Sequence, residues 1–282
     1  MIPLDVLFEK GGLPSYHLPA DLERLYGGGL GFESPRLYAN FVSSLDGVVA
    51  LEGEKHSSQM ISGQSVADRF VMGLLRACAD AVLIGAGTLR AAPGSLWTPT
   101  FIYPDAAGGF AELRRHLGRS HEPRLVLLTA RGEIEARHPA LEAGALVLTT
   151  SLGARELRNR LSASSTVVAL GDGRAINLID VIATVRGEGH EVVLSEGGPT
   201  VIAGLLQVGL LNELFLTLSP ILAGRSDARG RPGLVEGIEL LPSQSVPGDL
   251  LSIRKHGSHL FLRHAIQPEL GLPWAPAAPT KA

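Results

Sequence analysis

The segment SEGGPT, which ends at Thr200, has residue types that could bind an anion. It lies between a predicted buried strand and a predicted apolar helix, and Pro199 suits the first turn of that helix. The backbone amides of Gly197, Gly198 and Thr200 would face a ligand there, where the helix dipole favours a group such as a diphosphate. Glu196 stands at the mouth of this turn, where its carboxylate could hold a sugar hydroxyl or an amine. An ordinary glycine-rich turn between a strand and a helix would have the same sequence.

Two further polar turns follow predicted buried strands. In GAGTLR, Gly85 and Gly87 would let a ligand approach the backbone closely, and Thr88 offers a hydroxyl. This segment is not a dinucleotide-binding GxGxxG motif, because Arg90 replaces the third glycine and no helix is expected immediately after it. In SSLDG, Asp46 follows a strand end, which is where open α/β sheets bind ligands. A simple Asp-Gly turn would explain the same residues.

The elements that position these turns alternate between strands and helices up to about residue 210. This alternation predicts an α/β fold with a mostly parallel central sheet and helices on both faces. Gly257-Ser258 separates two strand-like runs, which predicts a C-terminal antiparallel hairpin. Ser62 is a suitable N-cap for one helix. We expect strands over 36–43, 80–84, 125–129, 145–150, 166–170, 191–195, 213–219, 250–256 and 259–266, and helices over 18–26, 62–79, 109–117, 154–161, 178–186 and 199–208.

The composition is that of a folded protein. The chain has 282 residues, of which 45% are hydrophobic and 19% are charged, and this balance excludes general disorder. We expect an N-terminal leader over 1–35, one α/β domain over 36–266 and a proline-rich tail over 267–282. The low share of charged residues suggests that part of the surface is covered by a subunit partner.

Several other classes of protein are not expected from this sequence. The net charge of −3 gives no basic surface for nucleic acid or for an anionic membrane. The start MIPLDVLFEK is not a signal peptide and no apolar stretch is long enough to span a membrane, so we expect a cytoplasmic protein. Cys78 is the only cysteine, which excludes intramolecular disulfides, and it is expected to be a small core residue. GxSxG, Walker A and HExxH segments are absent, and no metal site is expected.

Three segments, in this order and spacing, resemble a known family: NFVSSLDGVVA (40–50), DAVLIGAGTLRA (80–91) and VVLSEGGPTVIAGLLQVGLLNELFLTLSPILAG (192–224). The family is the reductase domain of the bifunctional riboflavin-biosynthesis deaminase/reductase, or RibD C-terminal family. The resemblance covers roughly residues 36–266 and implies a dihydrofolate reductase-like fold. It also implies a homodimeric enzyme that uses NADPH to reduce 5-amino-6-ribosylaminouracil 5′-phosphate to the ribityl compound in riboflavin biosynthesis.

The resemblance implies roles for individual residues. Glu196 and Asp46 would be catalytic, and either Glu196 or a bound water would donate the proton. Ser58, Arg76 and Glu196 would contact the substrate. NADPH would be bound by Gly85, Gly87, Thr88, Gly197, Gly198, Pro199, Thr200 and Val201.

Departures from the family pattern keep two alternatives open. Ala92 stands where the family has an acid that contacts the cofactor, and Met60 replaces a tryptophan. The loop over 93–99 lacks an expected basic residue, and its Trp97 could either stack on a heterocycle or anchor the loop. The alternatives are a reductase of a different small molecule and a nucleotide-binding protein without turnover. A single cysteine cannot supply the zinc site of the deaminase half, so any deamination would occur elsewhere.

Overall fold

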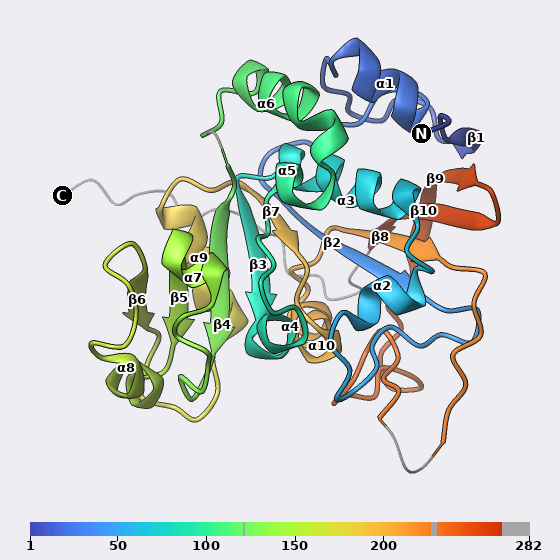
Figure 1. Ribbon diagram of the computed structural model, residues 1–282. Helices are drawn as coiled ribbons and strands as arrows, with labels where there is room; N and C mark the ends of the chain where they lie inside the picture. The colour runs from blue at the N-terminus through green and yellow to red at the C-terminus, as the bar shows by residue number, and fades with distance from the viewer. Residues whose placement is uncertain (121, 227–229, 267–282) are drawn as a thin grey trace.

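The computed structural model describes residues 1–120, 122–226 and 230–266, so the tail expected over 267–282 lies outside the described residues. The described strands form one sheet in the order β1-β9-β10-β8-β2-β7-β3-β4-β5-β6 (Figure 1). These strands are β1 (Asp5–Glu9), β2 (Arg36–Ser43), β3 (Ala81–Gly85), β4 (Arg124–Thr129), β5 (Ala145–Thr149), β6 (Thr166–Ala169), β7 (Val192–Ser195), β8 (Glu213–Leu218), β9 (Gly248–His256) and β10 (His259–Ile266).

The sheet has a parallel part and an antiparallel part. From β8 through β2, β7, β3, β4 and β5 to β6, neighbouring strands run parallel. β10, β9 and β1 continue the sheet in antiparallel pairs, with Gly257 at a positive φ of 58° in the β9–β10 turn. The predicted α/β class, the parallel sheet and the closing hairpin are therefore confirmed.

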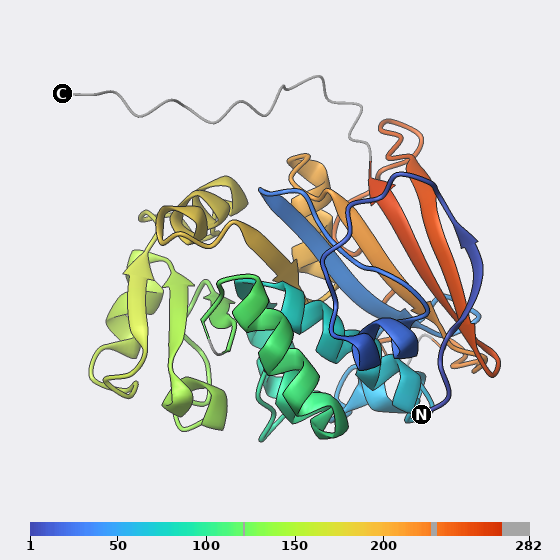
Figure 2. The ribbon, with the colours of Figure 1, turned by 90° about the horizontal axis from the view of Figure 1, so that it is seen from above.

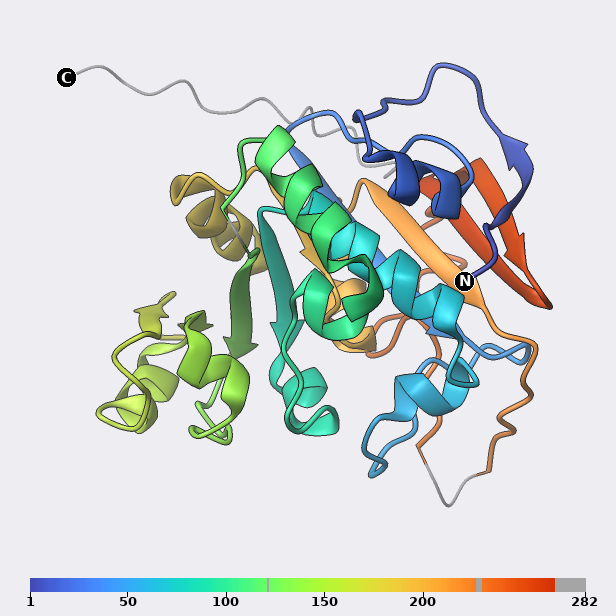
Figure 3. The same ribbon diagram turned by 45° about the horizontal axis from the view of Figure 1, so that its top comes forward.

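Helices cover both faces of the parallel part. α1, α3 and α6 lie on one face, with α6 packed along α3, and α9 and α10 lie on the other (Figures 2 and 3). Among the described residues no helix is long and apolar enough to cross a membrane. The helices are α1 (Ala20–Tyr26), α2 (Ser57–Ile61), α3 (Val66–Cys78), α4 (Ala86–Ala91), α5 (Pro99–Ile102), α6 (Ala107–His116), α7 (Pro139–Ala143), α8 (Ser151–Leu157), α9 (Leu178–Gly187) and α10 (Pro199–Gln207), with a 3₁₀ turn at Pro104–Ala106.

β3 shows how the two cores form on either side of the sheet. All five of its residues are buried, as expected for a parallel strand covered on both faces. Because successive side chains point to opposite faces, Val82 and Ile84 join the core under α3 and α6, whereas Ala81 and Leu83 join the core under α9 and α10. Continuous apolar runs of this kind made the parallel strands recognisable in the sequence.

Three local predictions are corrected by the structure. A helix, α4, begins directly after Gly85, where none was expected, and it ends before Pro93. The N-cap of α3 is Ser65 and not Ser62, because Gly63 and Gln64 adopt positive φ angles that interrupt the helix and separate α2 from α3. Between residues 91 and 108, where no element was expected, the structure has α5, the 3₁₀ turn and the start of α6.

The leader is packed onto the rest of the fold. Its predicted helix is confirmed as α1, and its β1, which was not predicted, pairs with β9. Leu22 and Tyr26 of α1 are buried in the core. Arg254 donates a hydrogen bond to the Tyr26 carbonyl at 2.9 Å, and its guanidinium lies 4.0 Å from the centre of the Tyr26 ring. These contacts join the first and last parts of the described chain.

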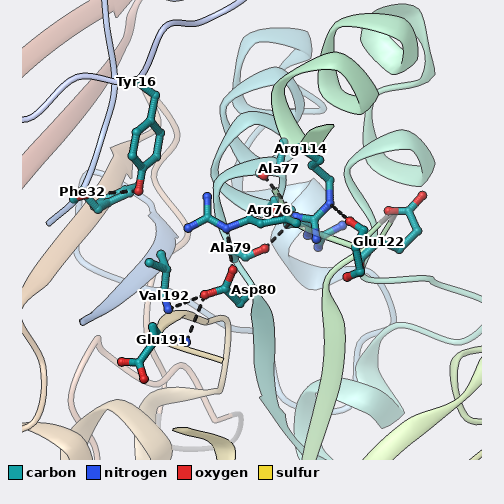
Figure 4. Close-up of polar contacts among 12 residues, drawn as sticks. Tyr16, Phe32, Arg76, Ala77, Ala79, Asp80, Arg114, Glu122, Glu191 and Val192 are labelled. Atoms are coloured by element: carbon teal, nitrogen blue, oxygen red, sulfur yellow. Dashed lines mark hydrogen bonds and ion pairs between the residues drawn. The ribbon is translucent and has the colours of Figure 1, made fainter. Parts of the chain in front are cut away.

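Charged side chains fix the elements at the amino-terminal edge of the parallel strands (Figure 4). Asp80 accepts hydrogen bonds from the backbone amides of Glu191 and Val192 at 3.0 and 2.7 Å and from Arg119 Nε at 2.5 Å. This carboxylate therefore ties the start of β3 to the start of β7.

Arg114 has a comparable role at the end of α3, which lies at the same edge (Figure 4). It is 1% exposed and donates to the carbonyls of Ala77 and Ala79 at 3.1 and 2.6 Å. A cation that binds the last carbonyls of a helix satisfies acceptors that have no partner within the helix. Asp80 and Arg114 thus fix α3, β3 and β7 relative to one another, which also fixes the turns at the carboxyl ends of these strands.

Candidate active site

A cavity of about 1080 Å³ opens at the carboxyl ends of β2, β3 and β7. β7 lies between the other two in the sheet, and all three run parallel, so the turns that follow β3 and β7 meet at the same edge (Figure 1). The helices α4 and α10 begin in these turns. The lining includes the substrate-contact residues expected from the sequence, Ser58, Arg76 and Glu196, and the expected cofactor residues Gly85, Gly87, Thr88, Gly197, Gly198, Pro199, Thr200 and Val201.

The two glycine turns touch each other and leave space beside them. The Thr88 hydroxyl lies 3.5 Å from the carbonyl oxygen of Glu196, across the two turns. A Cβ on Gly197 would come within 2.7 Å of Val201, so only glycine packs there. A Cβ on Gly87 would meet nothing within 4 Å, and one on Gly198 would meet only Thr88, at 3.9 Å. Gly87 and Gly198 therefore leave room that another molecule can fill.

Arg76 and Glu196 form a buried ion pair within the cavity. Arg76 donates from Nε and Nη2 to the two carboxylate oxygens of Glu196 at 2.8 and 2.7 Å. Their side chains are only 5% and 8% exposed, so the pair is largely shielded from water. The two-pronged geometry fixes the orientation of the carboxylate as well as its charge. The family resemblance implied that both residues contact the substrate but did not show that they bind each other.

The same arginine fixes the loop over 93–99. Arg76 Nη1 lies 3.5 Å from the Leu96 carbonyl and 3.3 Å from the Thr98 carbonyl. Trp97 is 5% exposed, lines the cavity, and packs against His138 with ring centres 5.9 Å apart. This packing favours the loop-anchor interpretation of Trp97, although its ring still contributes to the wall of the cavity.

Asp46 occupies a different place from the other predicted site residues. Hydrogen bonds from the Ser44 hydroxyl and from the backbone amides of Ala223 and Gly224 lower the pKa of its carboxyl to about 2. It is not among the described residues that line the cavity. Asp46 thus joins the turn after β2 to the segment after β8, and this position favours a positioning role over the direct catalytic role expected from the sequence.

Asp68 lines the cavity although no pattern in the sequence selected it. It lies in the first turn of α3, is 5% exposed, and has its pKa raised to about 6 by burial. Asp68, Met72 and Arg76 are spaced by four residues, which places them on one face of the helix, and all three line the cavity. This spacing, counted back from Arg76, is the signal that could have identified Asp68.

Two expectations about other residues can be compared with the structure. Cys78 is fully buried, and burial raises the pKa of its thiol to about 12, so it is a core residue and not a nucleophile. Within the described ranges, no group of three or more histidine, cysteine, aspartate or glutamate side chains could hold a metal ion.

Comparisons with known proteins identify the family of this chain. The chain matches the RibD C-terminal domain over residues 35–252. It is 26% identical over 196 residues to the 2,5-diamino-6-ribosylamino-4(3H)-pyrimidinone 5′-phosphate reductase of Archaeoglobus fulgidus. The aligned residues are 69% of this chain and 84% of the relative.

Two solved structures share the fold. One is a pyrimidine reductase-like protein of Corynebacterium diphtheriae, with a TM-score of 0.67 and 20% identity over 83% of this chain and 93% of that protein. The other is the riboflavin biosynthesis reductase of Saccharomyces cerevisiae, with a TM-score of 0.55 and 17% identity over 86% of this chain and 94% of that protein. The family match spans most of the described chain, and it includes the strands and turns that build the cavity. The chain therefore belongs to the RibD C-terminal domain family.

Proposed function

We propose that this protein is an NADPH-dependent reductase that converts a ribosylaminopyrimidine 5′-phosphate to the ribityl compound in riboflavin biosynthesis. The observation that carries the proposal is the meeting, in one cavity, of two open glycine turns and the buried pair of Arg76 and Glu196. Membership of the RibD C-terminal family and similarity to a reductase of this substrate class support it. We include in the proposal a cytoplasmic location.

The residues present fit a nicotinamide dinucleotide. Gly198, the N-cap of the nine-residue helix α10, has no side-chain cap among the described residues, and its missing Cβ leaves the helix end accessible. The amides of this first turn and the helix dipole would hold the diphosphate, and Gly87 and Thr88 would contact the neighbouring part of the cofactor. When bound, NADPH would supply the hydride.

The ion pair would position the substrate. Arg76 uses two donors on Glu196, but each carboxylate oxygen can accept a further hydrogen bond from a hydroxyl or amine of the substrate. Because the pair is buried and tied to the loop over 93–99, that contact would be made in a fixed geometry. Fixed placement of the reacting carbon against a hydride donor is the main contribution that a protein makes to such a reaction.

Arg174 is the residue that we propose for the extra phosphate of NADPH. Arg131, Arg155 and Arg174 are candidates for this contact, and of these three only Arg174 lines the cavity. It is exposed, as suits a group that meets a phosphate at the cavity mouth. We expect Arg174→Ala to weaken NADPH binding by about tenfold and to leave NADH binding unchanged, with Arg155→Ala as the control.

The first test is a fluorescence titration of the purified protein with NADPH and with NADH. Micromolar binding of NADPH and weaker binding of NADH supports the cofactor site. Turnover is then followed by the loss of NADPH absorbance with ribosylaminopyrimidine phosphates as substrates. Binding without turnover of these compounds would favour one of the two alternatives, a reductase of another molecule or a nucleotide-binding protein.

Glu196→Gln separates the substrate role from the cofactor role. It keeps the shape of the side chain but removes the charge that pairs with Arg76. We expect turnover to fall much more than NADPH affinity. An equal loss of both would argue against contact between Glu196 and the substrate.

We also propose a homodimer that uses the antiparallel edge of the sheet. β1 is the edge strand, and its Val6, Leu7 and Phe8 are 45%, 56% and 42% exposed. An edge strand with exposed apolar side chains readily pairs with a second chain. Light scattering should give the mass of a dimer, and Leu7→Lys should shift it toward a monomer. A wild-type mass of one chain at all concentrations would contradict the dimer.

A further inference from the structure

Asp68 is a buried residue that carries a carboxyl group and lines the cavity. It lies on the same face of α3 as Arg76, about two helical turns away, so the two are separated by roughly 12 Å along the helix. The residue is 5% exposed. A buried carboxylate is costly unless its oxygens are paired, so its presence in a ligand cavity requires an explanation.

The groups around Asp68 come from several elements. Thr217 of β8 hydrogen-bonds its carboxyl, His259 of β10 and Arg69 of α3 favour its charged form, and Glu196 opposes it. His259 is itself held by a hydrogen bond between Nε2 and the Ser62 carbonyl at 2.9 Å. Burial outweighs these neighbours and raises the pKa of Asp68 to about 6, so the group is mostly ionised at neutral pH.

The bonding capacity of this carboxylate exceeds what Thr217 uses. An ionised carboxylate can accept about four hydrogen bonds. The strongest arrangement is a pair of parallel hydrogen bonds from two adjacent N–H groups, one to each oxygen. A ligand that presents two adjacent N–H donors would therefore match Asp68. A ligand that presents a carbonyl oxygen at the same place would leave the buried charge facing a lone pair, which is strongly unfavourable.

This distinction separates two compounds of the proposed substrate class. A 2,5-diamino-4(3H)-pyrimidinone, the type of base named for the reductase of Archaeoglobus fulgidus, carries adjacent donors on its 2-amino group and N3. Hydrolytic loss of the 2-amino group gives a uracil, in which a carbonyl oxygen replaces one of these donors. Only the diamino base presents two N–H groups to a carboxylate along this edge.

We propose that Asp68 binds the 2-amino-4(3H)-pyrimidinone edge of the substrate and so selects the diamino compound over the corresponding uracil. The proposal rests on the proposed reductase function and specifies its substrate. It also gives the enzyme a place in a reaction sequence, because reduction then precedes the hydrolytic deamination of the base. This order differs from the uracil substrate that the family resemblance implied.

The test compares kcat/KM for the two substrates, 2,5-diamino-6-ribosylamino-4(3H)-pyrimidinone 5′-phosphate and 5-amino-6-ribosylaminouracil 5′-phosphate, at saturating NADPH. We expect the wild-type protein to prefer the diamino compound by at least about a hundredfold, as is typical of sites that discriminate through hydrogen bonds. The preference should decrease as the pH falls through about 6, because protonated Asp68 loses one acceptor and gains a donor.

Asp68→Asn should change the preference and not merely the activity. The carboxamide offers one donor and one acceptor, which matches the carbonyl oxygen and N3–H of uracil. We expect the ratio of the two kcat/KM values to fall by about a hundredfold, with most of the loss on the diamino compound. Thr217→Val, which removes the hydroxyl that orients Asp68, should reduce the ratio by roughly tenfold. This second variant carries the test if Asp68→Asn does not fold.

Asp180→Asn is the matched control, because Asp180 is an exposed carboxylate on α9 that is not among the described residues lining the cavity. It should leave both kcat/KM values unchanged. Equal wild-type kcat/KM on the two substrates, or an equal loss on both in Asp68→Asn, overturns the role of Asp68 and leaves the reductase function intact. A wild-type protein that binds NADPH but reduces neither compound overturns the proposed function itself.

Discussion

The two edges of the parallel sheet both hold buried charge, but they use it in different ways. At the amino-terminal edge, Asp80 is surrounded by Arg119 and two backbone amides, and Arg114 binds the carbonyls that end α3. At the carboxyl edge, Asp68 has Thr217 beside it and still faces a cavity, and the neighbouring glycine turns enclose open space.

The charged side chains at the amino-terminal edge stabilise the fold, whereas the charge of Asp68 at the carboxyl edge is available to bind a ligand. A buried ion with several protein partners is compensated in the folded state, so its removal lowers stability. A buried ion that lines a cavity is compensated only when a ligand completes its hydrogen bonds. Arg76 and Glu196 combine both properties. Their charges compensate each other in an ion pair, and both side chains line the cavity.

The largest effect is expected from Gly198→Asp at the carboxyl edge. Aspartate is a good N-cap, so α10 should remain folded, but its charge would lie beside the diphosphate. Two like charges about 4 Å apart repel by roughly 4 kcal/mol near a protein surface, which corresponds to about a thousandfold loss of NADPH affinity. Fluorescence titration measures this loss. Gly108→Asp, in the first turn of α6, is the control, and similar NADPH affinity in both variants would contradict the cofactor site.

Arg76→Met should affect both stability and turnover. It leaves the carboxylate of Glu196 buried without its partner. Removal of one partner of a buried ion pair lowers the unfolding free energy by about 3 to 4 kcal/mol. Urea denaturation measures the cost. The double variant Arg76→Met with Glu196→Leu should recover most of the stability but none of the turnover. Recovery of turnover in the double variant would show that the pair is only structural.

Arg114→Met should affect stability alone, because the residue lies at the edge opposite to the cavity. The carbonyls of Ala77 and Ala79 lose their buried donor, with an expected cost of roughly 3 kcal/mol. NADPH affinity and kcat/KM should stay at wild-type values below the unfolding temperature. Arg115→Met is the matched control, because Arg115 is the exposed neighbour on the same helix. A large loss of NADPH affinity in Arg114→Met would contradict the assignment of the amino-terminal edge to stability and the carboxyl edge to ligand binding.

The smallest effect is expected from the pH dependence of stability at Asp68. Its pKa is about 6 in the fold against an ordinary value of 3.8, so the folded protein binds the proton more tightly than the unfolded chain. The unfolding free energy therefore falls as the pH rises from about 4 to about 6. Asp68→Asn removes this penalty. The unfolding free energy of the variant should therefore exceed that of the wild type by about 2 to 3 kcal/mol at pH 8 and equal it near pH 4. An equal offset at both pH values would show that Asp68 is not buried as a charge.

Sequence reasoning succeeded where the pattern was repeated and local. The strands β3, β4 and β5 are continuous apolar runs, and the hairpin of β9 and β10 has its own turn, so their positions were predicted to within a few residues. β1 was missed because all five of its residues are exposed and only its pairing with β9 makes it a strand. α4 was missed because a six-residue helix containing glycine has little periodicity.

The candidate site divides in the same way. The glycine turns were found because glycine, proline and a strand end lie within a few residues of one another. The pairing of Arg76 with Glu196 joins residues 120 positions apart, and nothing local in either segment indicates it. Asp68 lies inside the helix predicted over 62–79, where a single acidic residue does not by itself indicate a site.

The amino-acid sequence by itself determined most of the strands and helices, and which turns can approach a phosphate, because these properties depend on neighbouring residues. The tertiary structure alone decided which charges are paired, which are buried and which face the cavity. Parallel packing of β2, β3 and β7 brings together turns that are distant in the chain. Surroundings, and not residue type, separate the two aspartates. Asp68 is buried and lines the cavity, whereas Asp80 is bound by three protein donors and belongs to the framework.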